Sequence, residues 1–208
     1  GVQDFFGREF RVTTDVLIPR PETELLVEAA LEVTSDATPF ICDVGTGSGC
    51  IAVTLLCEIS SARAVALDKS PAALEIAKLN AGELSVADRA VFVVSDCFES
   101  LDSREYQFDL IVSNAPYVSA DVLAGLQREV RDHEPLVALS PGPDGLSMIR
   151  RLLQEAPAFL KQNGYLIMEI GFDQGEKVQS LVDAGVWRLL ELRPDLQGIP
   201  RIVVLQKR

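Results

Sequence analysis

The sequence predicts an α/β fold built on a mostly parallel sheet. Short apolar segments typical of buried strands alternate with segments whose apolar residues recur at helical spacing. A glycine-rich turn follows the first of these strands, and an aspartate stands at the end of three successive strands: Asp43, Asp68 and Asp96. Because the carboxyl ends of parallel strands meet at one rim of the sheet, these residues predict a ligand site there.

The N-terminal part of the chain predicts a hairpin followed by a helix. The segment from Phe5 to Val12 alternates as a short strand or hairpin arm does. Two prolines in residues 17–24 block regular strand pairing. Apolar residues then recur at helical spacing, so a helix is expected to begin near Glu22. From composition alone, Arg20 is interpreted as a solvated charge.

The first strand, from Phe40, leads into the turn Gly45-Thr46-Gly47-Ser48-Gly49, and 51–59 predicts a helix. Glycines let the backbone turn sharply and let a ligand approach closely. The spacing is not the Gly-x-Gly-x-x-Gly of dinucleotide-binding folds, and the lysine of a phosphate-binding P-loop is absent. With Asp43 at the strand's end, the turn indicates a ligand site and disfavours a dinucleotide oxidoreductase.

The next two strands are 62–68, which ends on Asp68, and 90–95, which Asp96 follows directly. Asp68 is placed to bind the two hydroxyls of a ribose, because ionised carboxylates make strong hydrogen bonds. Ser70-Pro71 opens a helix with a capping residue and a proline at its first position. Asp96-Cys97 follows the third strand. Three acids in successive units indicate one ligand lying across the sheet rim.

The fourth strand carries the apolar run 110–112 and stops at Asn114-Ala115-Pro116-Tyr117. Such a run predicts a strand buried on both faces, which brings its end to the rim. A carboxamide offers an acceptor and donors, so this corner suits an amide or amine substrate. Asn and Pro are also common turn residues, and a plain turn is the alternative.

The remaining chain continues the same alternation. A long helix from Leu146 is expected to kink at Pro157 and to end at Asn163-Gly164. The later elements are a strand at 165–170, a helix around 178–182, and strands at 187–192 and 201–205. The segment 119–138 predicts a short helix, with His133 as a loop residue.

Composition narrows the class of protein. With 208 residues, 48% of them hydrophobic, the chain suits one domain with a large core. A formal net charge of −12 argues against a nucleic-acid-binding surface, and no apolar run is long enough to span a bilayer. One histidine leaves little material for a metal site, and no metal is expected. Four cysteines lack a Cys-x-x-Cys pair, which predicts free thiols and a cytoplasmic location: Cys42, Cys50, Cys57 and Cys97.

Several motifs together carry a resemblance. They are Leu17-Ile-Pro-Arg-Pro-Glu-Thr-Glu24, Asp43-Val-Gly-Thr-Gly-Ser-Gly49, Ile111-Val-Ser-Asn114, Asp144-Gly-Leu146 and Glu169-Ile-Gly171. The chain resembles the class I S-adenosylmethionine-dependent methyltransferases, and among them the release factor glutamine methyltransferases. The resemblance implies a Rossmann-like fold with a seven-stranded, mostly parallel sheet, an antiparallel last strand and a short β-hairpin before it.

The resemblance also divides the chain. It implies a β-hairpin and substrate-side segment over 1–21 and an S-adenosylmethionine-dependent methyltransferase domain over 22–208. The chain starts at Gly1, already inside a patterned segment. Because the family usually carries a helical domain before the residues seen here, we expect an N-terminal helical domain to precede them.

The implied reaction methylates the side-chain amide nitrogen (N5) of the glutamine in the Gly-Gly-Gln motif of class-1 peptide chain release factors. S-adenosylmethionine is the implied cofactor and S-adenosylhomocysteine the product. The implied catalytic and substrate-binding residues are Asn114, Ala115, Pro116 and Tyr117, with Arg20 and Glu22 at the substrate entrance. The implied cofactor-binding residues are Asp43, Gly45, Thr46, Gly47, Ser48, Gly49, Asp68, Asp96, Cys97 and Asn114.

The sequence departs from the family at Ala115, where the motif Asn-Pro-Pro-Tyr has a proline. Alanine frees the φ angle and adds unfolded-state entropy of about 0.4–1 kcal/mol. Pro116 still favours an extended residue before it, so we expect the site to persist, whether or not activity is lowered. Cys97 is smaller than the residue expected beside the adenine ring, which predicts a looser pocket.

Two other functions stay open. An N6-adenine methyltransferase acting on DNA or RNA uses a related corner, because exocyclic N6 is also a conjugated nitrogen. The acidic balance and the Pro-Arg-Pro-Glu-Thr string favour a protein substrate without direct nucleic-acid binding. The Ala115 departure also leaves room for a non-catalytic S-adenosylmethionine-binding partner subunit.

Overall fold

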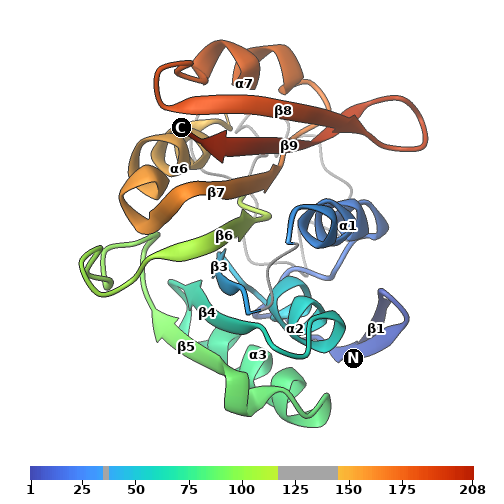
Figure 1. Cartoon of the computed structure of the whole chain (residues 1–208). Coiled ribbons are helices and arrows are strands. Elements are labelled where there is room, and N and C mark those ends of the chain that lie inside the picture. The colour runs from blue at the N-terminus through green and yellow to red at the C-terminus, as the bar shows by residue number, and fades with distance from the viewer. Residues whose placement is uncertain (35–37, 117–144) are drawn as a thin grey trace.

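A computed structural model describes residues 1–34, 38–116 and 145–208. Its centre is a seven-stranded sheet in the order β5-β4-β3-β6-β7-β9-β8, with helices on both faces (Figure 1). The strands are β3 (Phe40–Val44), β4 (Arg63–Asp68), β5 (Ala90–Val94), β6 (Phe108–Ser113), β7 (Leu160–Glu169), β8 (Trp187–Pro194) and β9 (Pro200–Lys207). The described helices are α1 (Glu24–Val33), α2 (Cys50–Glu58), α3 (Pro71–Glu83), α6 (Ser147–Phe159) and α7 (Gly175–Leu181), with short 3₁₀ turns at Pro21–Thr23 and Ala87–Arg89.

The direction of the strands follows the prediction. The pairs of β3 with β4 and β6, of β4 with β5, and of β6 with β7 are parallel. Among the described strands of this sheet, β9 alone has the reversed direction, and it pairs antiparallel with both β7 and β8. The mostly parallel seven-stranded sheet with an antiparallel last strand is therefore confirmed, and the carboxyl ends of β3 to β6 share one rim.

A short antiparallel hairpin, β1 (Val2–Phe5) and β2 (Arg8–Arg11), precedes the sheet as expected. Its Phe5 and Phe10 rings meet edge to face and are buried in the same apolar cluster as α1 and α2. Asn80 of α3 anchors the hairpin, because its Oδ1 accepts from the Arg11 backbone N–H at 2.8 Å. Its Nδ2 donates to the backbone oxygens of Arg11 and Ser48. The hairpin, α3 and the glycine-rich turn are thus held as one unit.

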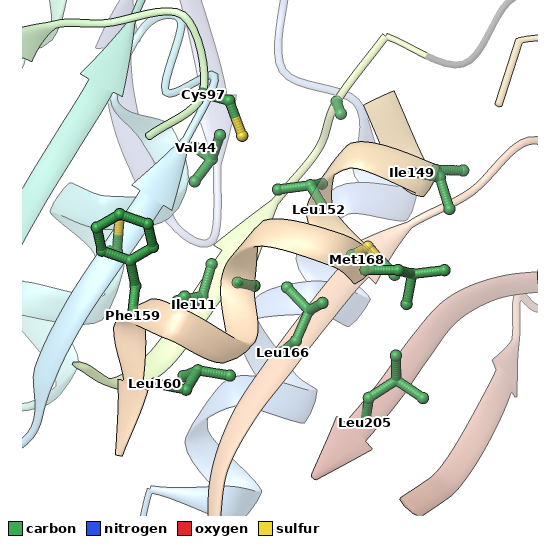
Figure 2. Packing of buried hydrophobic residues seen from close by; sticks show 14 of the residues in the cluster. Val44, Cys97, Ile111, Ile149, Leu152, Phe159, Leu160, Leu166, Met168 and Leu205 are labelled. Atoms are coloured by element: carbon green, nitrogen blue, oxygen red, sulfur yellow. The ribbon is translucent and has the colours of Figure 1, made fainter. Parts of the chain in front are cut away.

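The sheet separates two apolar clusters. On one face, Ile149, Leu152 and Phe159 of α6 pack over Ile111 and Leu166, as Figure 2 shows. On the other face, α1, α2 and α3 cover side chains that include Leu110, Val112 and Ile167. Neighbouring residues of β6 and β7 therefore enter opposite clusters, which confirms the prediction of strands buried on both faces.

The boundary between α6 and β7 differs from the sequence prediction. The helix ends at Phe159, and the strand begins at Leu160 instead of Tyr165. Asn163 has a φ of +62°, and the pairing with β6 shifts register between Phe108 and Leu110. Asn163-Gly164 therefore belongs to an irregular part of the strand, and the expected helix end at this dipeptide is wrong.

Two further expectations were that the cysteines are free thiols and that no segment spans a membrane. All four cysteines are free, with Cys42, Cys50 and Cys97 buried and Cys57 half-buried. In the described parts of the chain, no helix is both long enough and apolar enough to cross a membrane. His133 and Asp144 lie outside the described residues.

Candidate functional site

A cavity of about 520 Å³ opens where β3, β4, β5 and β6 end. This is the rim at which open α/β sheets bind ligands, and the volume suits a ligand of nucleoside size. Distant segments of the chain form its wall: parts of 14–19, 44–51, 68–73, 95–97 and 114–116, together with Thr23 and Met148. The predicted site residues Gly45, Thr46, Gly47, Ser48, Asp68, Asp96, Cys97, Asn114 and Pro116 all line it.

Residues 45–48 of the glycine-rich turn form the part of the cavity wall that follows β3. The backbone N–H groups of Gly45 and Thr46 both donate to the Leu67 oxygen at 2.9 Å, which fixes the turn to β4. Gly45 and Gly47 have positive φ angles and open space where a side chain would stand. Gly49 differs, because a Cβ there would lie 3.0 Å from the Cβ of Ala77 in α3. Gly49 therefore serves helix packing and does not line the cavity.

Asp43 lies beneath this turn and is fully buried. Its Oδ2 accepts from the Thr46 hydroxyl at 2.6 Å and from the Ala52 backbone N–H at 3.3 Å. Its Oδ1 has no hydrogen-bond partner among the described residues. Burial raises the pKa of Asp43 to about 7, against the opposing effect of the two hydrogen bonds and with a further increase from Asp68. Asp43 is not among the described residues that line the cavity, so its carboxylate would act on a cationic ligand group by charge, from beneath the glycine-rich turn.

Asp68 stands on the cavity wall at the end of β4. Its Oδ2 accepts from the Gly47 backbone N–H and its Oδ1 from that of Ser70, each at 2.9 Å. The two bonds hold the carboxylate rigidly between the glycine-rich turn and the start of α3. Each carboxylate oxygen keeps further acceptor capacity, so ligand hydroxyl groups can still donate to Asp68.

An arginine of α6 holds Asp96, the third of the acids at the strand ends, in place. Arg151 of α6 donates to the Asp96 carboxylate at 2.6 Å and to the Asp96 backbone oxygen at 3.0 Å. Cys97 follows with a φ of +53° and is buried. Burial, with a contribution from Glu155, raises the pKa of its thiol to about 12. Cys97 therefore offers the cavity a neutral packing surface and no thiolate nucleophile.

Asn114 follows β6 directly and lies on the cavity wall. Its Nδ2 donates to the Thr23 hydroxyl at 3.0 Å, and that hydroxyl donates to Oε2 of Glu169 at 2.7 Å. Ala115 is buried beside it, whereas Tyr117 lies outside the described residues. The Ser113 hydroxyl donates to the Val44 oxygen at 2.7 Å and so ties this corner to the glycine-rich turn.

Sequence reasoning missed part of this arrangement. Arg20 and Glu22 are half-buried and are not among the described residues that line the cavity. Thr14, Asp15 and Val16, which join the hairpin to the 3₁₀ turn, do line it. Thr23 and Glu169 fell inside motifs that carried the resemblance, but nothing in the sequence alone assigned either of them a role at Asn114.

The sequence was compared with protein families and with known proteins, and the matches are methyltransferases. The family described as "Methyltransferase domain" matches residues 36–182. A release factor glutamine methyltransferase of Cereibacter sphaeroides is 50% identical over 98% of this chain and 71% of its own length. One from Nitratidesulfovibrio vulgaris is 44% identical over 100% of this chain and 70% of its own length.

A solved structure shows the same fold at much lower identity. The T. thermophilus 16S rRNA methyltransferase in complex with AdoMet and guanosine is 18% identical, with a TM-score of 0.65 over 100% of this chain and 50% of that one. At this identity the likeness concerns the fold alone. The high identity over most of both chains assigns the family: this chain belongs to the release factor glutamine methyltransferases.

Proposed function

We propose that this chain transfers a methyl group from S-adenosylmethionine to the side-chain amide nitrogen (N5) of the glutamine in the Gly-Gly-Gln motif of class-1 peptide chain release factors. One observation carries the proposal beyond family membership. The carboxamide of Asn114 lies on the cavity wall with its NH₂ group directed at Thr23, which leaves Oδ1 to accept a hydrogen bond from a substrate amide.

The cavity fits S-adenosylmethionine in chemistry as well as in size. The buried carboxylate of Asp43, beneath the glycine-rich turn, would attract an ammonium group bound against that turn. Gly45 and Gly47 leave space for the methionine portion, and Asp68 has acceptor capacity for ribose hydroxyls. Asp96 and Cys97 line the part of the cavity that the adenine ring would occupy. These hydrogen-bond acceptors suit a cationic amino acid joined to a nucleoside.

The reaction requires alignment more than it requires a base. A glutamine amide nitrogen is a weak nucleophile, because its lone pair is delocalised into the carbonyl group. When bound, S-adenosylmethionine supplies an electrophilic methyl group on a sulfonium. Oδ1 of Asn114 and the backbone oxygen of Ala115 would accept hydrogen bonds from the substrate NH₂ group. Those bonds hold the nitrogen in line and stabilise the positive charge that develops on it.

Other roles in this site remain predictions. Tyr117 would pack on the flat amide group, and Pro116 would stiffen the corner next to Ala115. Arg20 and Glu22 would shape the substrate entrance. The division into a substrate-side segment, 1–21, and a catalytic domain, 22–208, is part of the same proposal, as is a cytoplasmic site of action.

The decisive experiment incubates the protein with labelled S-adenosylmethionine and a class-1 release factor, followed by mass spectrometry of the digested factor. A gain of one methyl group on the glutamine of the Gly-Gly-Gln peptide is expected. A parallel incubation with DNA and RNA tests the N6-adenine alternative. Label that appears on nucleic acid and not on the release factor would overturn the proposal, as would cofactor binding without transfer to either.

Asn114→Ala tests the corner itself. Losing one aligned polar group in a transition state typically costs about 10²–10³ in rate. We therefore expect kcat to fall by that factor, while calorimetry shows nearly unchanged binding of S-adenosylmethionine. Wild-type turnover by Asn114→Ala would exclude the proposed role of this carboxamide.

A further inference from the structure

We propose that Thr23 and Glu169 are positioning residues that set the orientation of the Asn114 carboxamide, so that its oxygen and not its NH₂ group faces the substrate. The inference deepens the proposed function and rests on it. The observation behind it is a chain of two hydrogen bonds, from Asn114 Nδ2 to Thr23 Oγ1 and from that hydroxyl to Glu169 Oε2.

The direction of the two bonds determines which end of the amide is free. A threonine hydroxyl carries a single proton, and here that proton is donated to the Glu169 carboxyl group. Towards Asn114 the same oxygen can therefore act only as an acceptor. The Asn114 side chain must present its NH₂ group to Thr23, which places Oδ1 on the opposite edge of the carboxamide.

The orientation matters because the two edges of an amide are similar in shape and opposite in hydrogen bonding. A carboxamide rotated by half a turn would direct its own NH₂ group at the substrate NH₂ group. Two donors would then face each other, and the hydrogen bond that aligns the attacking nitrogen would be lost. The correct edge must be selected before the substrate arrives, because a preorganised acceptor needs no rearrangement during the reaction.

Burial makes the selection effective. Thr23 is 1% exposed and Glu169 is 2% exposed, so solvent does not readily replace the two bonds. Removing either buried partner leaves a polar group without its hydrogen bond, so the side chains near it must rearrange. The bonds also join three separate elements, because Thr23 precedes α1, Asn114 follows β6, and Glu169 ends β7.

Thr23 occupies a position where a different role would be usual. It stands at the N-cap of α1, where a threonine hydroxyl commonly accepts a hydrogen bond from the first turn of the helix. In the described helix α1, the Thr23 side chain forms no such capping bond. The hydroxyl is engaged by Glu169 and Asn114 instead, so its loss should affect the catalytic corner more than the helix.

The test compares Thr23→Val with Thr23→Ser, which differ in the hydroxyl group while both keep a small side chain. We expect Thr23→Val to lower kcat by about 10–100-fold, because small misplacements of a reacting group can cost about that much. Thr23→Ser should recover most of the lost activity. The Kd for S-adenosylmethionine should stay within about threefold of wild type, because the carboxamide oxygen serves the substrate, and kcat should change more than the KM for the release factor does.

Thr54 of α2 provides a matched control. It is also a fully buried threonine, but its hydroxyl has no hydrogen-bond partner among the described residues and it is not part of the cavity wall. Thr54→Val should leave kcat unchanged and should not lower the melting temperature. Nuclear magnetic resonance adds a readout independent of turnover: the Asn114 side-chain NH₂ protons should exchange faster with water in Thr23→Val.

Each outcome has one meaning. Absence of methylation by the wild-type protein would overturn the proposed function, and the exchange measurement would still test the hydrogen-bond chain. Wild-type kcat in Thr23→Val would overturn the positioning role while the function stands. A parallel loss of melting temperature and cofactor affinity, or Thr23→Ser as inactive as Thr23→Val, would show a structural role instead. If Thr23→Val does not fold, Thr23→Ala replaces it in the same comparison.

Discussion

At the residue scale, Asp43 combines full burial with an unpartnered oxygen among the described residues. Its folded-state pKa is about 7, raised by burial above the ordinary value of an aspartate. Between the two values the folded protein holds a proton that the unfolded chain has released. This contribution to stability is fully present below the unfolded pKa and is lost as the pH rises through about 7.

We therefore expect the free energy of unfolding of the ligand-free protein to decrease from pH 5 to pH 7, by up to about 1.4 kcal/mol per pH unit from this group. Urea titrations at several pH values measure the slope. Asn cannot titrate, so Asp43→Asn should have a slope less negative by this amount. Identical slopes for the two proteins would show that Asp43 is already ionised in the fold.

Bound S-adenosylmethionine should reverse this preference. An ammonium group near Asp43 favours the ionised carboxylate, so binding below about pH 7 must release its proton. Affinity should then fall as the pH is lowered from 7 to 5.5, by up to about tenfold per unit. Calorimetry in buffers of different ionisation enthalpy would count the released proton. An affinity independent of pH would separate Asp43 from the ammonium group.

The residues that sequence reasoning located differ in kind from those it missed. Asp43, Asp68 and Asp96 could be placed together because each follows a strand, and strand ends in a parallel sheet share a rim. The partners of Asn114 could not be found in this way. Thr23 is 91 residues from Asn114 and 146 residues from Glu169, and only the folded chain brings them into contact.

At the scale of the element, the glycine-rich turn contains glycines with different tasks. Gly47 has a φ of +55° and nothing within 4 Å of the position that a Cβ would take, whereas at Gly49 an added Cβ would meet Ala77 at 3.0 Å. The left-handed backbone costs a non-glycine residue about 1–2 kcal/mol, and overpacking adds about 1–3 kcal/mol. Gly49 is therefore constrained by the protein, and Gly47 by the space that a ligand would fill.

Two alanine substitutions should separate these tasks. Gly49→Ala should lower the melting temperature more than Gly47→Ala does. Gly47→Ala should weaken S-adenosylmethionine binding by more than about tenfold, because the new methyl group stands in the ligand's space. Gly198→Ala, at a φ of +82° in the β8–β9 connection with open space around it, measures the backbone cost alone. Equal ligand affinity in Gly47→Ala and Gly198→Ala would contradict the assignment.

The α6–β7 boundary shows where element prediction failed. Asn-Gly is a frequent helix terminator because both residues tolerate left-handed backbone. The same tolerance suits an irregularity within a strand, and Asn163 has that backbone conformation inside β7. Gly164 is also in close contact there, since an added Cβ would lie 3.2 Å from the Asp109 oxygen of β6. The prediction of a helix end at Asn163-Gly164 was therefore wrong, because pairing of this segment with β6 places the dipeptide inside a strand.

At the scale of the whole molecule, the α/β fold with a mostly parallel sheet was foreseeable because apolar strands and helical segments alternate along the chain, whereas the order of the strands in the sheet comes only from the folded structure. The cavity was harder to predict, because its wall combines segments that are far apart in the sequence, from residues 14–19 after the hairpin to Met148 of α6. The two apolar clusters lie on opposite faces of the sheet, and the site lies at the rim where the strands between them end. A ligand in that cavity contacts elements from both layers and should therefore stabilise the molecule as a unit.

Ligand binding should thus raise the melting temperature of the entire chain in one cooperative transition. At a concentration 100 times its Kd, S-adenosylmethionine adds about 2.7 kcal/mol to the free energy of unfolding. For a domain of this size that corresponds to a shift of about 5–10 °C. Asn114→Ala should keep the shift, because its oxygen serves the substrate, whereas Gly47→Ala should lose about half of it or more at the same concentration. Differential scanning calorimetry measures the shift in each variant. If the ligand did not raise the melting temperature of the wild-type protein, or if it split the transition in two, the cofactor would not stabilise both layers of the molecule together.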